Sequence, residues 1–197
     1  MSKSQQAESH LKKSQEALKT GMFKWNPDYD SAAFESKKAA DIYRSLKKYD
    51  KAIETYELTS DNYLKTKVNA AFNAAKCQEL IAQCIKESTG LKTFSDVIKF
   101  ETYAENAGKL YEEPAPDTAI HFLTKSVQGL ANVISQVAYG ANPDMKYVTQ
   151  LSKTGLSLLV RAGNISKKDV TRGFETAKVY SECAKISKVI INDKRLI

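Results

Sequence analysis

The residues of this 197-residue chain that could do chemistry are two histidines, three cysteines and a few adjacent carboxylates. His10 and His121 lie far apart in sequence, and neither belongs to a Glu-x-x-His or other paired metal-ligand pattern. Glu112 and Glu113 directly precede Pro114, where solvated charges are a simpler interpretation than an acid/base pair. The sequence contains no P-loop, nucleophile elbow or glycine-rich dinucleotide turn. We therefore expect no enzymatic activity, no metal site and no cofactor.

The cysteines also favour a structural role. Cys77, Cys84 and Cys183 form neither a CxxC motif nor an obvious disulfide framework. Cys77 and Cys84 are seven residues apart, which places them on one helix face and predicts buried thiols. The N-terminus has no apolar signal core, and no window of the sequence approaches a membrane-spanning length of apolar residues. We expect a cytoplasmic protein.

The charge balance points to acidic partners. Lys and Arg total 30 against 23 for Asp and Glu, which gives a net charge of +7. Lysine dominates over arginine, which suits diffuse attraction better than bidentate reading of bases or phosphates, so we expect no nucleic acid partner. Lysines recur in nearly every expected helix or turn, and a stacked array of helices could align some of them into a basic stripe. The alternative is an ordinary solvated surface.

The elements that must position these residues are helices. Strand signals are nearly absent, and apolar residues recur at helical spacing throughout the chain. In residues 67–88 the expected apolar stripe comprises Val68, Ala71, Phe72, Ala75, Leu80, Ile81, Cys84 and Ile85. The sequence therefore predicts an all-α fold.

Helix breakers divide the chain into about eight pieces. They lie at 21–27, 47–49, 66–67, 89–90, 114–116, 140–143 and 163–166. Side chains that could cap the helix N-termini are Asp28, Asp50, Ser95, Asp117, Asn142 and Ser166. Pro116 and Pro143 lie where a first-turn proline is tolerated.

A faint repeat underlies this pattern. YDSAA at 29–33, YDKAI at 49–53 and PDTAI at 116–120 each open a helix with Asp and a small residue, and FSDVI at 94–98 is a looser copy. Small residues let neighbouring helices approach closely, while the later Tyr43, Tyr56 and Tyr111 would fill the remaining gaps. We expect residues 1–197 to form a single domain, a solenoid of antiparallel helix pairs of the tetratricopeptide type, although the tetratricopeptide consensus itself is not met.

Between the first two expected helices, residues 19–30 read KTGMFKWNPDYD and contain three large apolar side chains. Gly21 could end the first helix, and Pro27 with Asp28 could start the second. The tip between them, Met22 to Trp25, would then hold Lys24 among apolar groups. Inserted into a bilayer interface, such a tip contributes a few kcal/mol at about 25 cal/mol per Å², and each nearby lysine adds about 1 kcal/mol against anionic lipid. The alternative is a loop whose aromatic rings fold back into the core.

The same region resembles a known family. Residues 18–56 read LKTGMFKWNPDYDSAAFESKKAADIYRSLKKYDKAIETY. A helix, a KW-P-DYDSAA loop and helix start, and then a lysine-containing turn resemble the N-terminal helices of the soluble NSF attachment protein (SNAP) family, and most of all its gamma-SNAP branch. Weaker similarity continues through NAAK at 73–76, PDTA at 116–119 and LLVR at 158–161.

This resemblance implies a fold, two partners and a membrane contact. The fold is a twisted, right-handed array of antiparallel helices, which binds the side of a SNARE four-helix bundle and recruits the ATPase NSF to disassemble it. The loop after the first helix touches the membrane in this family, and its contact residues here are Met22, Phe23, Lys24 and Trp25. The basic residues that match SNARE-binding positions are Lys47, Lys86, Lys125 and Lys153.

We therefore expect a non-enzymatic adaptor in vesicle trafficking, cytoplasmic and peripheral on membranes. The alternative is a generic helical-repeat module for protein–protein interaction, with Phe23 and Trp25 in its core. The family continues into a C-terminal helical bundle and a tail that engages NSF, whereas this chain ends at Ile197. We expect that bundle to be absent and the chain to be a shortened or divergent relative.

Overall fold

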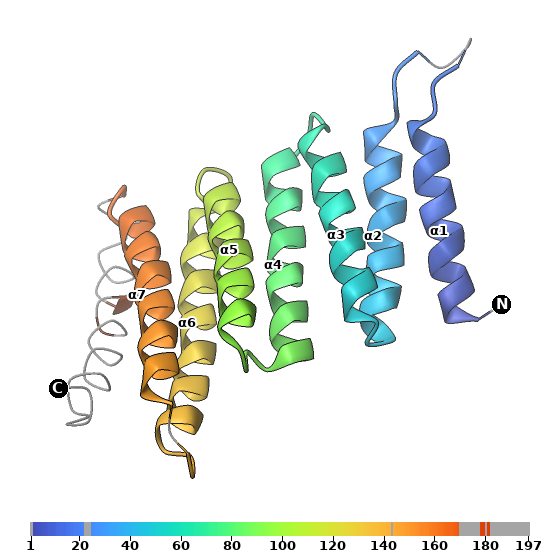
Figure 1. Ribbon diagram of the computed structural model, residues 1–197. Coiled ribbons are helices and arrows are strands. Elements are labelled where there is room, and N and C mark those ends of the chain that lie inside the picture. Colours follow the sequence, from blue (N-terminus) through green and yellow to red (C-terminus); the bar gives the residue numbers. More distant parts are fainter. Residues whose placement is uncertain (1, 22–24, 143, 170–177, 180, 182–197) are drawn as a thin grey trace. The chain divides into compact units, whose positions relative to one another are not determined.

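The computed structural model describes residues 2–21, 25–142, 144–169, 178–179 and 181 (Figure 1). Regular secondary structure in these residues is helical, apart from an isolated bridge at Gly21. The helices are α1 (Lys3–Leu18), α2 (Tyr29–Ser45), α3 (Tyr49–Leu64), α4 (Ala70–Thr89), α5 (Phe94–Tyr111), α6 (Pro116–Ala138) and α7 (Met145–Ser166). Consecutive helices within each compact part of the chain pack as antiparallel pairs. The fold is thus all-α and of the tetratricopeptide-like solenoid type.

Contacts between residues divide the chain into two compact units. Unit 1 spans Met1–Gly90 and contains α1 to α4, and unit 2 spans Leu91–Ile197 and contains α5 to α7. Within unit 1 each helix packs against the next one along the chain, and within unit 2 α5 packs against both α6 and α7. The expectation of one domain over residues 1–197 stays a prediction.

The repeated Asp-plus-small-residue signature marks helix starts as expected. The copies at 29–33, 49–53 and 116–120 open α2, α3 and α6, and the looser copy at 94–98 opens α5. Asp28 is the N-cap of α2, where its carboxylate accepts a hydrogen bond from the backbone N–H of Ser31 at 2.9 Å. Pro116 lies in the first turn of α6, where it removes no helical hydrogen bond.

Other expected boundaries shift by a few residues. Thr93, not Ser95, caps α5, because the Thr93 hydroxyl and the Asp96 carboxylate form a reciprocal capping box. Asp144, not Asn142, caps α7. The N-caps of α3 and α6 are Lys48 and Ala115, neither of which makes a side-chain cap, so Asp50 and Asp117 lie in the first turns instead, where a negative charge suits the helix dipole.

Two glycines do not end helices where the sequence predicted. α1 ends at Leu18, three residues before Gly21. α7 continues through Gly163, which is buried, and ends at Ser166. A glycine can remain inside a helix where close packing needs the missing side chain. Pro143 and Cys183 lie outside the described residues.

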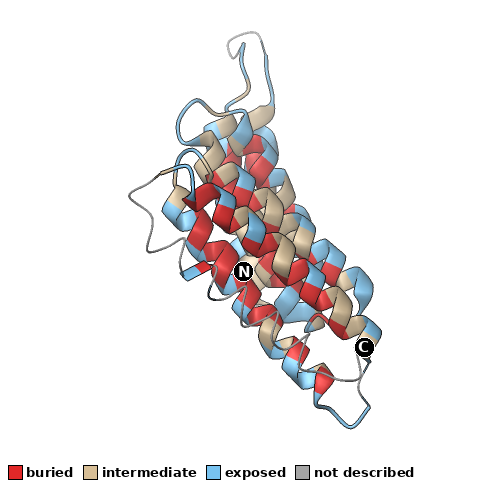
Figure 2. Ribbon diagram, turned by 90° about the vertical axis from the view of Figure 1, so that its left-hand side faces the viewer, coloured by how far each residue is buried: buried red, intermediate tan, exposed pale blue. Residues whose placement is uncertain are grey.

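Many of the buried positions of unit 1 are occupied by small residues. Figure 2 shows buried positions along the helices in red. The alanines with no solvent exposure on α2 and α3 are Ala32, Ala33, Ala39, Ala40 and Ala52. The larger Tyr43 and Tyr56, later in the same helices, are 2% and 1% exposed. Tyr111 of α5 in unit 2 is also fully buried. The predicted division between small residues at close approaches and tyrosines in the gaps is confirmed.

Hydrogen bonds donated by side chains join successive helices of unit 1. Ser14 of α1 donates to the Ala32 carbonyl at 2.8 Å. Thr59 of α3 donates to the Ser36 hydroxyl of α2 at 2.9 Å, and Gln78 of α4 donates to the Ser60 hydroxyl at 3.1 Å. Such short bonds require the helix backbones to lie close together, which the alanines permit.

The antiparallel order gives unit 1 two ends. The α1–α2 and α3–α4 connections, residues 19–28 and 65–69, form what we call the loop end (Figure 1). The α2–α3 turn, residues 46–48, and the C-terminus of α4 form the opposite, turn end. At the turn end Arg44 of α2 donates to Glu87 of α4 at 2.6 Å, and Lys48 donates to Ser4 of α1 at 3.1 Å.

A ladder of polar contacts joins α5 to α7 in unit 2. Thr154 donates to Glu101 at 2.8 Å, and one turn further Ser157 donates to Glu105 at 2.9 Å. Arg161 continues the series toward Glu112. Because the partners advance in the same direction along both helices, α5 and α7 run parallel, as the first and third helices of an antiparallel series do.

The apolar stripe predicted for residues 67–88 is correct within α4 and wrong at its start. Cys77 and Cys84 are buried on one face, and burial raises the pKa of the Cys77 thiol to about 12 and that of Cys84 to about 11. Val68 precedes the helix in the α3–α4 loop and is 69% exposed. Asn69, with φ of 51°, breaks the helical backbone between Val68 and α4.

Substitutions of Tyr56 test how much the large buried tyrosines contribute to the stability of unit 1. Its hydroxyl donates to the Asp41 carboxylate at 2.6 Å. We expect Tyr56→Phe to lower the free energy of unfolding by about 1 kcal/mol through the lost hydrogen bond, and Tyr56→Ala to lower it by about 3–5 kcal/mol through the cavity. Denaturant unfolding followed by circular dichroism measures both.

Tyr139 provides the matched control, since it is 74% exposed. Tyr139→Phe and Tyr139→Ala should change the free energy of unfolding by less than about 0.5 kcal/mol. If Tyr56→Ala were as mild as Tyr139→Ala, Tyr56 would not be the packing element described above.

Candidate functional site

The loop end of unit 1 carries the apolar segment singled out in the sequence. Trp25 is described and is 86% exposed, so its ring does not belong to the core. Its neighbours Asn26 and Gly21 are exposed as well. Met22, Phe23 and Lys24, the other three predicted membrane-contact residues, lie outside the described residues. The role of all four in membrane contact stays a prediction.

Both sides of this loop are fixed by hydrogen bonds. The backbone N–H of Asp28 donates to the carbonyl of Ala17 in the last turn of α1 at 3.0 Å. The Asp28 side chain simultaneously caps α2. The chain therefore leaves α1 and enters α2 at defined points.

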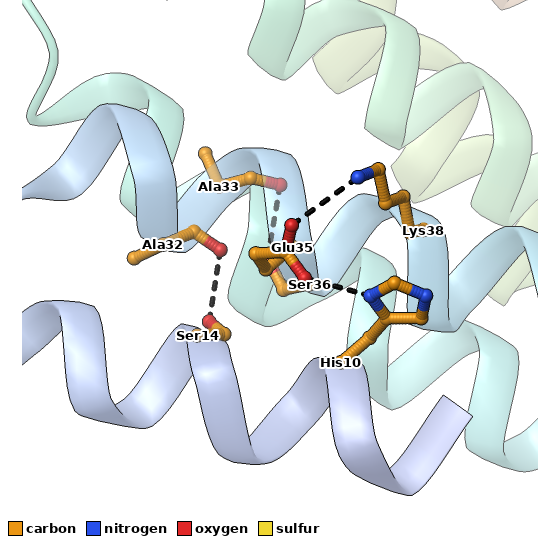
Figure 3. A network of polar contacts seen from close by, with 7 residues as sticks. All are labelled: His10, Ser14, Ala32, Ala33, Glu35, Ser36 and Lys38. Carbon is orange, nitrogen blue, oxygen red and sulfur yellow. Dashed lines mark hydrogen bonds and ion pairs between the residues drawn. The ribbon is translucent and has the colours of Figure 1, made fainter. Parts of the chain in front are cut away.

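Polar contacts between α1 and α2 set the alignment of this hairpin (Figure 3). Nδ1 of His10 lies 2.7 Å from one carboxylate oxygen of Glu35, and the Lys38 ammonium lies 3.2 Å from the other. The hydrogen bond from His10 lowers the pKa of the Glu35 carboxyl, and Lys38 lowers it further, against the opposing effect of burial. Ser14, one turn further along α1, bonds the α2 backbone at Ala32.

The predicted SNARE-binding residues of unit 1, Lys47 and Lys86, both lie at its turn end. Lys47 is exposed in the α2–α3 turn, and Lys86 is exposed in the last turn of α4. The Arg44–Glu87 ion pair ties these two segments together. Among the described residues neither Lys47 nor Lys86 forms an ion pair. The structure thus brings both cations to one end of unit 1.

The backbone of Lys47 is unusual. Its φ is 56°, in the left-handed region that favours glycine or asparagine. Its N–H donates to the Arg44 carbonyl at 2.9 Å, which closes the end of α2. A lysine at this position therefore costs stability relative to glycine, and a function for its ammonium group would account for it.

The remaining two predicted residues lie in unit 2. Lys125 is exposed on α6, where it lines an open hollow together with Asp117, His121 and Gln128. Lys153 is exposed on α7. Whether a basic stripe joins Lys125 and Lys153 to the lysines of unit 1 stays a prediction.

Sequence reasoning missed a second apolar feature at the loop end. Leu64 is the last residue of α3 and is 49% exposed, and Val68 lies in the α3–α4 loop and is 69% exposed. The helical spacing of apolar residues in α4 extends by chance to Val68. The sequence therefore suggested that Val68 is a buried helix residue and not an exposed loop residue. The signal that could have revealed it is the polar run Lys65–Thr66–Lys67 followed by Asn69, a residue that tolerates left-handed backbone.

None of the helices in the part of the chain that the structure describes is long and apolar enough to cross a membrane.

Comparison with known proteins gives an informative similarity over part of the chain. No protein-family model matches the chain. Over 82 residues the chain is 34% identical to the Gamma-soluble NSF attachment protein of Dictyostelium discoideum, and the match covers 42% of this chain. It covers 25% of that relative, so the similarity spans about a quarter of the relative's length. The match supports a SNAP-like relationship over that segment.

The contact between His10 of α1 and Glu35 of α2 should make the free energy of unfolding depend on pH. Because the folded state lowers the pKa of Glu35, this carboxylate stabilises the fold above the pKa of the unfolded chain, and the contribution is lost as pH falls through the folded pKa. We expect Glu35→Gln to reduce the free energy of unfolding at pH 7 and the reduction to shrink below about pH 4. Urea unfolding at several pH values measures this.

Glu113→Gln is the control, because Glu113 is exposed at the end of α5. Its effect should stay small at every pH. A Glu35→Gln effect that is equal at pH 7 and at pH 3 would contradict stabilisation of the fold by the ionised Glu35 carboxylate.

Proposed function

We propose that this protein is a non-enzymatic adaptor of the SNAP type in vesicle trafficking. It binds SNARE four-helix bundles and the membrane surface and recruits the NSF ATPase for bundle disassembly. The observation that carries the proposal is the 34% identity over 82 residues to a gamma-soluble NSF attachment protein. The tetratricopeptide-like fold supports it, since stacked helix pairs offer extended surfaces to long partners.

The turn end of unit 1 meets the SNARE bundle in this proposal. Lys47 and Lys86 attract the acidic surface of the bundle and set its register, while exposed lysines such as Lys125 and Lys153 extend the contact from unit 2. The left-handed backbone of Lys47 supports its assignment. Recruitment of NSF rests on the relative alone, whose name describes attachment to that ATPase.

The loop end meets the membrane. Trp25 suits the headgroup boundary, because its indole combines a large apolar surface with an N–H donor. Met22 and Phe23 add apolar surface and Lys24 pairs with lipid phosphate. The protein is then cytoplasmic and peripheral on membranes, held by weak and reversible contacts.

Charge removal at the turn end tests SNARE binding. We expect Lys47→Gly with Lys86→Glu to reduce capture of a purified SNARE complex by roughly tenfold at low salt and by less at high salt. Lys47→Gly relieves the left-handed backbone, so this substitution by itself should not destabilise the fold. The measurement is a pull-down without lipid at two salt concentrations, with thermal unfolding alongside.

Lys12→Glu with Lys13→Glu is the control, because both lysines are exposed on α1 away from the turn end. Equal capture by the test and control variants would remove Lys47 and Lys86 from the site. Absence of wild-type capture would instead favour the generic protein-interaction module.

Removal of the aromatic rings tests membrane contact. We expect Phe23→Ser with Trp25→Ser to lower the fraction of protein that sediments with anionic liposomes by about tenfold or more, since a buried aromatic ring contributes several kcal/mol. Helicity should be unchanged, because Trp25 is exposed. Unaltered sedimentation of a folded variant would refute the membrane role of this loop.

A further inference from the structure

We propose that the α3–α4 loop of unit 1 is a second contact point with anionic lipid, in which Leu64 and Val68 enter the bilayer interface and Lys65 and Lys67 bind lipid headgroups. The proposal rests on the proposed membrane role of the loop end and extends it to a segment that neither the sequence pattern nor the SNAP resemblance indicated.

Two exposed lysines of this loop lie between two exposed apolar side chains. Leu64 is 49% and Val68 is 69% exposed, and Lys65 and Lys67 between them are exposed as well. No acidic residue occurs from Leu64 to Asn69. Apolar side chains flanked by ammonium groups suit a lipid interface, where the former enter the acyl boundary and the latter stay with the phosphates.

The loop is held in shape before any ligand arrives. The Thr66 hydroxyl donates to the Tyr63 carbonyl at 2.7 Å, and the Thr66 backbone N–H donates to the same carbonyl at 2.9 Å. The N–H of Lys65 donates to the Asn62 carbonyl at 3.1 Å. Because these bonds fix the turn, little conformational entropy is lost on binding, which favours contact by even two modest apolar side chains.

The α3–α4 loop lies at the same end of unit 1 as the α1–α2 connection, to which Trp25 belongs (Figure 1). The Lys65 ammonium lies 5.3 Å from the centre of the Tyr29 ring, at the first residue of α2, just after the α1–α2 loop. Neighbouring helices pack about 8–10 Å apart, so the two loops lie within roughly 20–30 Å and can reach one lipid surface together.

Charge favours a membrane over a protein groove as the occupant. The acidic side chains at this end, Glu16, Asp28, Asp30 and Asp61, lie in or beside the helices. Asp28 is already engaged as the cap of α2. Within the loop segments 19–27 and 65–69 the charged residues are all lysines, which suits the negative surface of a bilayer.

A second contact would fix the orientation of unit 1 on the membrane and strengthen its binding. One inserted tip leaves the protein free to tilt, whereas two tips on neighbouring helix pairs restrict the tilt of unit 1. Because the affinities of linked contacts multiply, two weak contacts give useful binding where one alone does not. The turn end, with Lys47 and Lys86, is then held away from the lipid surface.

Vesicle partitioning of the full chain tests this proposal. Two variants are compared with the wild type on phosphatidylcholine vesicles with and without phosphatidylserine. Leu64→Gln with Val68→Ser should lower partitioning about fivefold on both vesicle types. Lys65→Glu with Lys67→Glu should lower it about tenfold or more on phosphatidylserine vesicles, with little change on phosphatidylcholine.

Matched controls come from unit 2 and from α1. Ile98 and Val160 are 44% and 57% exposed, so Ile98→Gln with Val160→Ser removes comparable apolar surface elsewhere. Lys12→Glu with Lys13→Glu makes the same charge change on α1. Both controls should stay within about twofold of the wild type on every vesicle.

A gain-of-binding variant removes any ambiguity from misfolding. Trp25 is the only tryptophan of the chain. In a Trp25→Phe background, Val68→Trp should partition about fivefold more strongly than the background protein, because indole favours the interface. Its fluorescence should shift to the blue on phosphatidylserine vesicles. Unchanged partitioning and emission would overturn the proposal.

The outcomes separate this inference from the proposed function. If Trp25→Ser lowers partitioning while the Leu64 and Val68 variant behaves like its control, the second contact is refuted and the membrane role of the first loop stands. If the wild type binds neither vesicle, both membrane contacts fall. SNARE capture without lipid is measured separately and is affected by neither result.

Discussion

Close approach between helix backbones is the constraint on which unit 1 depends. Its helices stack side by side, so each interface must be tight by itself. Fully buried alanines such as Ala33 and Ala40 bring the backbones together, and the hydroxyl of Ser14 can then reach the carbonyl of Ala32 on the next helix. The buried Ser14 hydroxyl thereby has a hydrogen-bond partner. Further along α2 and α3, the larger Tyr43 and Tyr56 fill the space between the helices. This packing leaves the connections at both ends free to carry other residues.

Local chemistry explains which parts of the fold could be predicted. Helix starts marked by Asp and a small residue were correct, because capping and close packing act within a few residues of the chain. Val68 was misplaced because a helical period of apolar residues does not reveal where the backbone leaves the helix. That point is set by the left-handed Asn69, which makes no side-chain cap. The shift from Ser95 to Thr93 has a different origin, since the two hydroxyl-bearing residues flank Phe94 and only Thr93 is matched by a carboxylate three residues later, Asp96.

The candidate site was predictable in its residue types and less so in its arrangement. Sequence alone indicated an exposed Trp25, and it is exposed. That Lys47 and Lys86 share one end of unit 1 follows only from the pairing of α2 with α4 through Arg44 and Glu87, a contact 43 residues apart in sequence. The left-handed backbone of Lys47 likewise arises from the geometry of the α2–α3 turn. Neither the composition of the sequence nor its residue spacing predicts this conformation.

The antiparallel order of four helices also explains why two kinds of partner need not compete. Odd-numbered connections, α1–α2 and α3–α4, must emerge at one end, and the even one, α2–α3, at the other. In this chain the former carry Trp25, Leu64 and Val68, and the latter carries Lys47. Among the described residues of the turn end there is no exposed large apolar side chain. An apolar, cationic end suits lipid, whereas an end with exposed lysines and no exposed large apolar side chain suits an acidic protein surface. In the proposed adaptor, a membrane and an acidic helical bundle would therefore occupy opposite ends of one helical unit.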